Sequence, residues 1–140
     1  MNDEEKFEGF KQKLIEDNER QYGEEIRTKY GDEAIDRSNA KLMGMTKEQY
    51  EESERLTQEL NETLKSAFDQ GDPESALAQK ACQLHKEWLC VYWAEGTYSK
   101  EAHRALAQGY VEDERFRAHY DNIAPGLAVF LRDAIEVFCR

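Results

Sequence analysis

The chain has 140 residues and a mass of 16.4 kDa, which is enough for one domain with a buried core. Its formal net charge of -11 and its pI of about 4.8 oppose binding to the phosphates of nucleic acid. No apolar run approaches the roughly 20 residues that span a bilayer, and the acidic start MNDEEK is unlike a signal peptide. With an odd count of 3 cysteines, we expect a cytoplasmic protein.

Helical periodicity predicts a first helix from Phe7 to Tyr30, followed after a glycine by a short helix over residues 32–43. The apolar face of the first helix is narrow, glycines interrupt it, and its other faces are charged. It would be marginal without a partner to pack on. Residues 1–70 are therefore expected to form an acidic helical segment.

A stronger start signal stands at Thr46, because Gln49 three residues later completes a capping box. We expect this third helix to stop at Gly71, and Asp72 with Pro73 to open the next one. The inward face of that fourth helix is expected to carry Leu77, Ala81, Leu84, Trp88 and Val91.

The segment 93–98 breaks the helical period and contains a glycine, so we expect a loop. Ser99 is expected to cap the following helix, Asp113 to cap a short helix, and Pro125 to start the last helix. The inward face of that last helix is expected to carry Leu127, Phe130, Leu131, Ala134, Ile135 and Phe138. No stretch shows the alternation of a strand. The sequence therefore predicts an all-α fold of about seven helices, in one domain over residues 1–140.

Aromatic residues concentrate in residues 71–140, the expected aromatic-rich core. Six aromatic side chains gather around one helix-loop-helix junction: Trp88, Tyr92, Trp93, Tyr98, His103 and Tyr110. Trp88 lies on the inner stripe, which favours the hydrophobic core over a site. Trp93 and Tyr98 lie in the loop, where two large exposed aromatic side chains favour a binding site. For His103, a surface position and one facing the same cleft remain open.

Catalytic and metal sites find little support. Cys82 and His85 have a spacing that can share a metal, but zinc needs two further ligands that no second pair supplies. Cys90 lacks an orienting group and an oxyanion site, so we interpret it as a small buried hydrophobic residue. We expect no metal, no cofactor and no enzymatic activity.

A family resemblance rests on the motif GYVEDERF at residues 109–116, on Tyr120-Asp121 and on APGLA-x-FLRDAI at 124–135. Shorter matches are KYGD at 29–32, MTKE at 45–48 and His85-x-x-Trp88. These segments resemble the TipAS-type antibiotic-recognition domain, the effector domain of thiostrepton-induced and multidrug-responsive MerR-type transcription regulators. The resemblance implies a globin-like helical fold that binds large apolar antibiotics such as thiopeptides. It also implies an N-terminal segment that becomes ordered only with ligand.

The chain departs from that family in two respects. Members that bind thiostrepton attach it covalently through a cysteine in the aromatic loop, whereas Gly96 stands near that position here in a longer loop. Cys90 lies a turn or more earlier, so we predict reversible binding. The family's DNA-binding helix-turn-helix and dimerising helix are not among these residues, so DNA would be reached only through such a domain. A regulator's effector domain and a stand-alone drug-sequestering protein both remain open.

We hypothesise that a bulky hydrophobic or macrocyclic antibiotic is bound without chemistry, in a cleft lined by Trp88, Leu89, Tyr92, Trp93, Tyr98, His103, Tyr110 and Tyr120. Apolar contact would supply most of the affinity, and the polar tips of His103 and the tyrosines would orient the ligand. The alternative is a helical protein-protein interaction module, in which the same aromatic side chains bind a partner helix.

Overall fold

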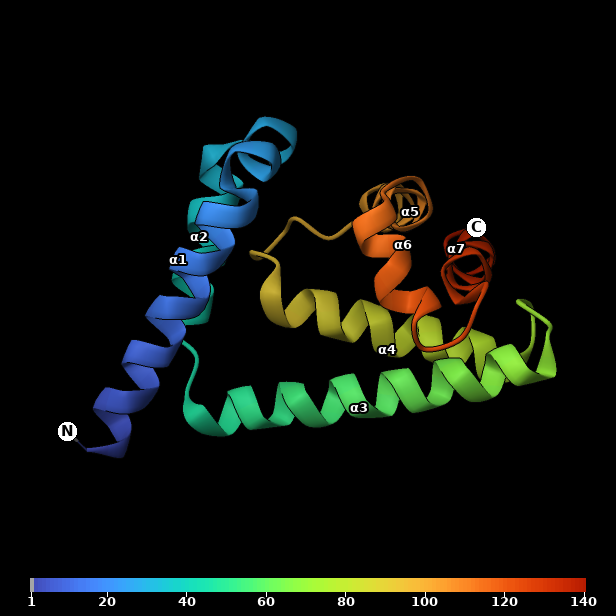
Figure 1. The fold of residues 1–140 in the computed structure, drawn as a ribbon, viewed down its shortest axis with the longest axis horizontal. Helices are drawn as coiled ribbons and strands as arrows, with labels where there is room; N and C mark the ends of the chain where they lie inside the picture. Colours follow the sequence, from blue (N-terminus) through green and yellow to red (C-terminus); the bar gives the residue numbers. More distant parts are fainter. Residues whose placement is uncertain (1) are drawn as a thin grey trace. The chain divides into compact units, whose positions relative to one another are not determined.

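The computed structural model describes residues 2–140, and within them the chain forms seven α-helices and no strand (Figure 1). The helices are α1 (Asp3–Tyr30), α2 (Asp32–Met43), α3 (Lys47–Gln70), α4 (Ala76–Tyr92), α5 (Lys100–Glu112), α6 (Glu114–Asp121) and α7 (Leu127–Phe138). The prediction of an all-α fold is confirmed. Over residues 2–140, no helix combines the length and the apolarity needed to cross a membrane.

Local capping sets most of the helix ends, and there the predictions are confirmed. The Thr46 hydroxyl accepts a hydrogen bond from the Gln49 amide at 3.1 Å, and the Gln49 side chain accepts one from the Thr46 amide at 2.8 Å. Ser99 and Asp113 likewise accept main-chain N–H bonds at the starts of α5 and α6. Gly71 ends α3 with a φ of 83°, a conformation that glycine adopts without strain.

Three predicted helix starts are wrong, each by a few residues. The first helix begins at Asp3 and not at Phe7, because the Asn2 side chain caps it by accepting a hydrogen bond from the Glu5 N–H at 2.8 Å. The fourth helix begins at Ala76, because the hydroxyl of Ser75 supplies its cap while Asp72 only closes a turn. The last helix begins at Leu127 and not at Pro125, because the glycine between them has a φ of 91°, which a helix residue does not adopt.

The described residues group into two compact units. One consists of the residues up to Glu52 together with Tyr92–Thr97, and the other of Ser53–Val91 together with Tyr98–Arg140. The loop after α4 therefore groups with α1 and α2, although α4 and α5 belong mainly to the second unit. The prediction of a single domain over residues 1–140 remains a prediction.

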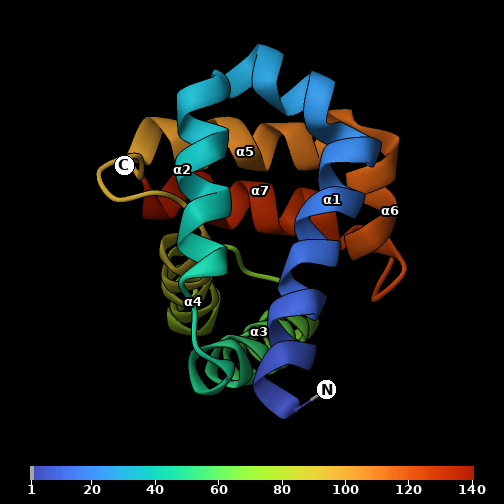
Figure 2. The same cartoon turned by 90° about the vertical axis from the view of Figure 1, so that its left-hand side faces the viewer.

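In the first unit, α1 and α2 lie side by side (Figure 2). A cluster of charged side chains joins the two helices. The Arg27 guanidinium of α1 lies 2.7 Å from Glu19, 3.1 Å from Asp32 and 2.8 Å from Asp36. The Glu19 carboxylate also accepts a hydrogen bond from the side-chain amide of Asn39 at 3.0 Å. These carboxylates raise the pKa of Arg27, and the Arg27 hydrogen bond lowers the pKa of Glu19. The α1-α2 pair thus depends on charge more than on apolar packing.

A buried ammonium group makes the second connection within this unit. Lys11 of α1 is 1% exposed, and its Nζ donates to the main-chain oxygens of Met43 at 2.6 Å and of Met45 at 2.8 Å. By contrast, the apolar face of α1 leaves Phe10 43% and Leu14 36% exposed. The structure therefore agrees with a narrow apolar face, while ordering of this segment by a ligand remains a prediction.

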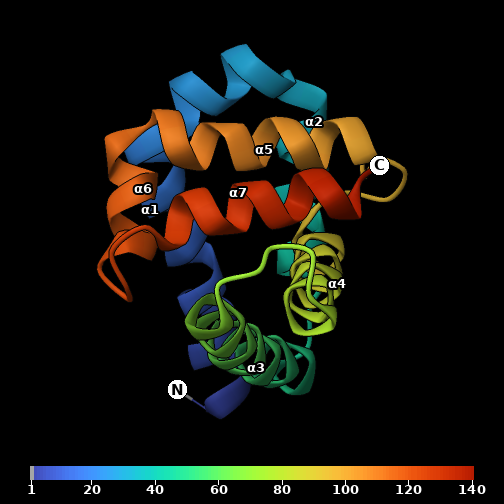
Figure 3. The ribbon, with the colours of Figure 1, turned by 90° about the vertical axis from the view of Figure 1, so that its right-hand side faces the viewer.

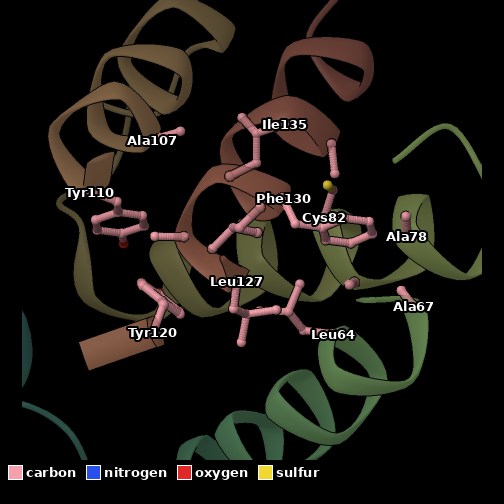
Figure 4. Close-up of a cluster of buried hydrophobic side chains, with 14 of the residues drawn as sticks. Leu64, Ala67, Ala78, Cys82, Ala107, Tyr110, Tyr120, Leu127, Phe130 and Ile135 are labelled. Atoms are coloured by element: carbon pink, nitrogen blue, oxygen red, sulfur yellow. The ribbon is translucent and has the colours of Figure 1, made fainter. Parts of the chain in front are cut away.

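The hydrophobic core of the second unit lies between α3, α4, α5, α6 and α7 (Figure 4). Helices α5 and α7 pack side by side in it, with α6 connecting them (Figure 3). The predicted inward face of α7 is confirmed, since Leu127, Leu131 and Ile135 are fully buried. The rings of Phe68 and Phe130 meet edge to face with centroids 5.6 Å apart.

We predict that Arg27→Gln loosens α1 and α2 and leaves the second unit intact, because one guanidinium holds three carboxylates there. Amide hydrogen exchange should become several-fold faster in α1 and α2 and stay unchanged in α7. Raising the salt concentration to about 1 M should reproduce part of the effect on the wild type.

Arg20→Gln is the matched control, because Arg20 is 73% exposed and pairs only within α1, with Asp17. Equal exchange rates for the two variants would contradict a special role of Arg27.

Candidate functional site

The aromatic segment predicted to bind ligand begins on α4 and runs through the loop to Tyr98. On α4, His85 and Leu89 are buried because residues four apart share one helical face. Trp88 is half-buried, with its ring 6.1 Å from that of His85, so its predicted assignment to the core is only partly right. The loop begins directly after Tyr92, as predicted.

A chain of hydrogen bonds crosses the buried side of this segment. His85 Nδ1 lies 2.8 Å from His103 Nε2, and the other ring nitrogens reach two phenols, with His103 Nδ1 2.8 Å from the Tyr98 hydroxyl and His85 Nε2 3.2 Å from the Tyr110 hydroxyl. The two imidazoles are stacked, with an interplanar angle of 10°. Four side chains from α4, α5 and the end of the loop therefore form one connected polar network.

The network is satisfied only when the hydrogens point in a consistent direction. A neutral imidazole carries one N–H, so either His85 donates to His103 or His103 donates to His85. In the first case Tyr110 donates and Tyr98 accepts, and in the second case the two phenols exchange these roles. Both histidines can therefore be fully hydrogen-bonded while neutral.

Burial keeps both histidines neutral. It lowers the pKa of His85 to about 3, with a further contribution from His103, and the pKa of His103 to about 4, with a further contribution from the Lys86 ammonium. Both side chains have 0% exposure, so a charged imidazole here would lose its hydration. At neutral pH this site offers hydrogen bonds and apolar surface, with no imidazolium charge.

The Tyr98 phenol at one end of the network is also neutral. Burial raises the pKa of Tyr98 to about 12, and it does the same for Tyr120, whose ring lies 4.9 Å from that of Tyr110. The Lys86 ammonium lies 5.0 Å from the centroid of the Tyr98 ring, a cation-π contact. The Tyr98 ring is thus held at its hydroxyl and over its face.

The loop backbone is held from α2, within the first unit. Three side chains of α2 donate to loop carbonyl oxygens: Ser38 Oγ to Tyr92 at 2.7 Å, Lys41 Nζ to Trp93 at 2.8 Å and Arg37 Nη2 to Glu95 at 2.7 Å. Inside the loop, the Thr97 hydroxyl donates to the Ala94 carbonyl at 2.6 Å. The path of the loop is therefore fixed by hydrogen bonds that side chains donate to its main-chain carbonyl oxygens.

The eight predicted ligand residues divide by exposure. Half-buried are Trp88, Tyr92, Trp93 and Tyr98. Buried are Leu89 at 1%, His103 at 0%, Tyr110 at 7% and Tyr120 at 8% exposure. Of the two positions left open for His103, the surface position is wrong. That the eight line one cleft remains a prediction.

Several features of the site were missed or misjudged from sequence. Cys90 is exposed and not buried, because successive helix residues turn by about 100° and its neighbour Leu89 takes the inward position. The sequence presents His85 as a possible metal ligand with Cys82 and as part of the motif His85-x-x-Trp88, but it does not reveal the bond to His103, although the position of His85 on the inner face of α4 is readable from the periodicity. Within residues 2–140, no group of three or more His, Cys, Asp or Glu residues is placed to hold a metal ion.

The neutral histidine pair predicts how stability changes with pH. The pKa of both groups is lowered on folding, so the unfolded chain binds more protons below about pH 6.5. The contribution of the two histidines to the free energy of unfolding should be completely present above pH 7 and should decrease as the pH drops from about 6.5 towards 5. The slope from each histidine is at most about 1.4 kcal/mol per pH unit. Urea unfolding at pH 7, 6 and 5 measures it.

His103→Gln should be less stable than the wild type at pH 7 but should lose less stability between pH 7 and 5. His119→Gln, which removes an exposed histidine, should keep the wild-type slope. If a variant fails to fold, the imidazole nitrogen shifts of the wild type provide the same test. A protonated His85 or His103 in the folded protein at pH 5.5 would contradict the account.

Comparisons with known proteins agree with this architecture. The family of TipAS antibiotic-recognition domains matches residues 22–138. The transcriptional activator TipA of Streptomyces coelicolor is 34% identical over 117 residues, covering 82% of this chain and 46% of TipA. The activator mta of Bacillus subtilis is 27% identical over 139 residues, covering 99% of this chain and 53% of mta. The chain thus spans about half the length of these relatives.

A solved structure gives the same result. The Streptomyces lividans TipAS domain in complex with nosiheptide, described as part of a thiopeptide antibiotic multidrug resistance system, superposes with a TM-score of 0.66. It is 31% identical and covers 86% of this chain and 85% of that one. The helical, globin-like architecture implied by the sequence motifs is confirmed. The chain belongs to the family of TipAS antibiotic-recognition domains.

Proposed function

We propose that this protein binds bulky, largely apolar antibiotics of the thiopeptide class and does no chemistry on them. The proposal rests above all on the similarity of this protein to a TipAS domain that was solved in complex with nosiheptide. The aromatic segment from Trp88 to Tyr98 supports it, because half-buried tryptophan and tyrosine side chains provide large apolar contact area at low entropic cost.

The predicted ligand residues take two roles in this proposal. The half-buried Trp88, Tyr92, Trp93 and Tyr98 contact the ligand. The buried Leu89, His103, Tyr110 and Tyr120 have a supporting role, in which His103 holds Tyr98 by a hydrogen bond. The hydrogen-bonded network fixes Tyr98, so part of the ordering cost of binding is met before the ligand arrives.

Apolar contact is sufficient for useful affinity. Burying about 300 Å² of apolar ligand surface at about 25 cal/mol per Å² stabilises the complex by about 7 kcal/mol before ordering costs. Micromolar binding corresponds to a net free energy of about 8 kcal/mol, and association itself costs at least about 4 kcal/mol, so a macrocycle has to bury about 500 Å² to reach it. Neutral histidines and phenols suit such a ligand, since no buried charge has to be desolvated.

Binding is reversible in this proposal. Gly96, which stands near the position of the cysteine used by covalent binders, has a φ of 79°, a conformation that L side chains rarely adopt. The loop therefore offers no thiol at that point, and the exposed Cys90 lies on α4 and not in the loop.

The biological setting proposed is that of the relatives. TipA and mta are helix-turn-helix transcriptional activators, and this chain corresponds to about half of each. We therefore favour an effector domain of a cytoplasmic MerR-type regulator, with DNA contacted by a separate domain, over a stand-alone drug-sequestering protein. No complete catalytic constellation was found in the sequence, which supports a non-enzymatic role.

Replacing Trp93 by alanine should weaken nosiheptide binding by about tenfold or more, as expected for a buried aromatic contact, and should change Tm little. Isothermal titration calorimetry measures the affinity, and intact mass after incubation should show no adduct.

Ile123→Ala is the control, because it removes an apolar side chain that is 38% exposed and far from the segment in sequence. A Trp93→Ala variant that loses stability and affinity in parallel would assign Trp93 to the core. No binding to nosiheptide or related thiopeptides, together with self-association through the aromatic side chains, would favour the interaction module.

A further inference from the structure

Three neighbouring side chains of α2 hold the backbone of the aromatic loop. Arg37, Ser38 and Lys41 lie on one side of the helix, because positions three and four apart are adjacent on its surface. Their donor atoms reach three loop carbonyl oxygens at 2.7 to 2.8 Å. We call these three residues the α2 latch.

The latch acts chiefly on the main chain, and the Lys41 ammonium in addition lies 3.8 Å from the exposed Glu95 carboxylate. The main-chain acceptors of the latch are the carbonyl oxygens of Tyr92, Trp93 and Glu95. The Tyr92 and Trp93 carbonyls belong to the two planar peptide units on either side of the Trp93 Cα. Fixing both carbonyls therefore also fixes the direction in which the Trp93 side chain leaves the backbone. A loop with the same sequence but without the latch would sample many more orientations.

The two ends of the loop are held differently. Tyr92–Thr97 groups with α1 and α2, whereas Tyr98 is held by His103 in the second unit. Between these two attachments lies Gly96, whose φ of 79° gives the backbone a turn that other residues adopt only with strain. The aromatic side chains before Gly96 therefore follow the position of α2, and Tyr98 after it follows α5.

We propose that Arg37, Ser38 and Lys41 are positioning residues for antibiotic binding: by holding the loop backbone on α2 they set the orientation of Trp93. This inference rests on the proposed function for its ligand, but the latch itself can be tested without one. It also links any ordering of α1 and α2 to the aromatic loop, because the latch joins α2 to the loop backbone.

The three latch bonds are unequal. Ser38 and Lys41 are half-buried, whereas Arg37 is exposed. Water competes least for the shielded bonds, and a charged donor makes a stronger bond than a neutral one. Lys41 should therefore contribute most and Arg37 least.

The first experiment uses the ligand-free full chain. In a Trp88→Phe background Trp93 is the remaining tryptophan, so its fluorescence reports the loop alone. Adding Ser38→Ala and Lys41→Gln should shift Trp93 emission to the red and raise acrylamide quenching about twofold or more. Ser66→Ala with Lys13→Gln, exposed positions on α3 and α1, is the matched control and should leave both readings unchanged.

The second experiment measures nosiheptide affinity for variants of the wild-type chain, in which Trp88 is kept. Lys41→Gln and Ser38→Ala should each weaken binding by about threefold to tenfold, the loss expected for one shielded hydrogen bond. Arg37→Gln should weaken it less. Lys41→Arg, which still presents a donor to the Trp93 carbonyl, should restore most of the affinity while Tm stays close to that of Lys41→Gln.

The outcomes separate this inference from the proposed function. If the wild-type chain binds no thiopeptide but the latch variants change Trp93 emission, the latch is real and the ligand is wrong. If the wild-type chain binds nosiheptide and the latch variants match the controls in both emission and affinity, the positioning role is overturned. Equal affinity losses for Lys41→Gln and Lys41→Arg would also overturn it.

Discussion

The hydrogen bond between the imidazoles of His85 and His103 is the interaction on which the site depends. It joins α4 to α5 where both rings are fully buried. Each ring then fixes one phenol: His85 fixes the buried Tyr110, and His103 fixes Tyr98 at the end of the loop. Because burial lowers the pKa of both histidines, the network is neutral. A neutral, satisfied network can support an apolar binding surface without placing an uncompensated charge beneath it.

The two units use different physical interactions. The second unit has a dry core in which Leu64, Leu127 and Ile135 are fully buried. The first unit relies on charge: Arg27 joins α1 and α2 through carboxylates, and Lys11 donates to two main-chain oxygens. Ionic contacts of this kind contribute less stability than apolar burial and respond to salt. A segment held in this way is suited to folding that is coupled to ligand binding.

Sequence reasoning succeeded where the determinants are local. The capping box at Thr46 and the inward face of α7 follow from residues a few positions apart, and the structure has both. It failed where contacts join distant segments. The bond from Ser38 to the loop spans 54 positions, and the partner of Lys11 lies 32 positions away. Nothing in the neighbourhood of a lysine in a charged helix indicates that its ammonium will be buried.

The central claim is that the aromatic segment from Trp88 to Tyr98 receives a thiopeptide antibiotic. Intermolecular NOEs between nosiheptide and the isotope-labelled protein test it most directly. The account predicts NOEs from macrocycle protons to the ring protons of Tyr92 and Trp93, with the imidazole protons of His103 showing none. A bound ligand whose NOEs fall elsewhere, with none to the segment, would contradict it.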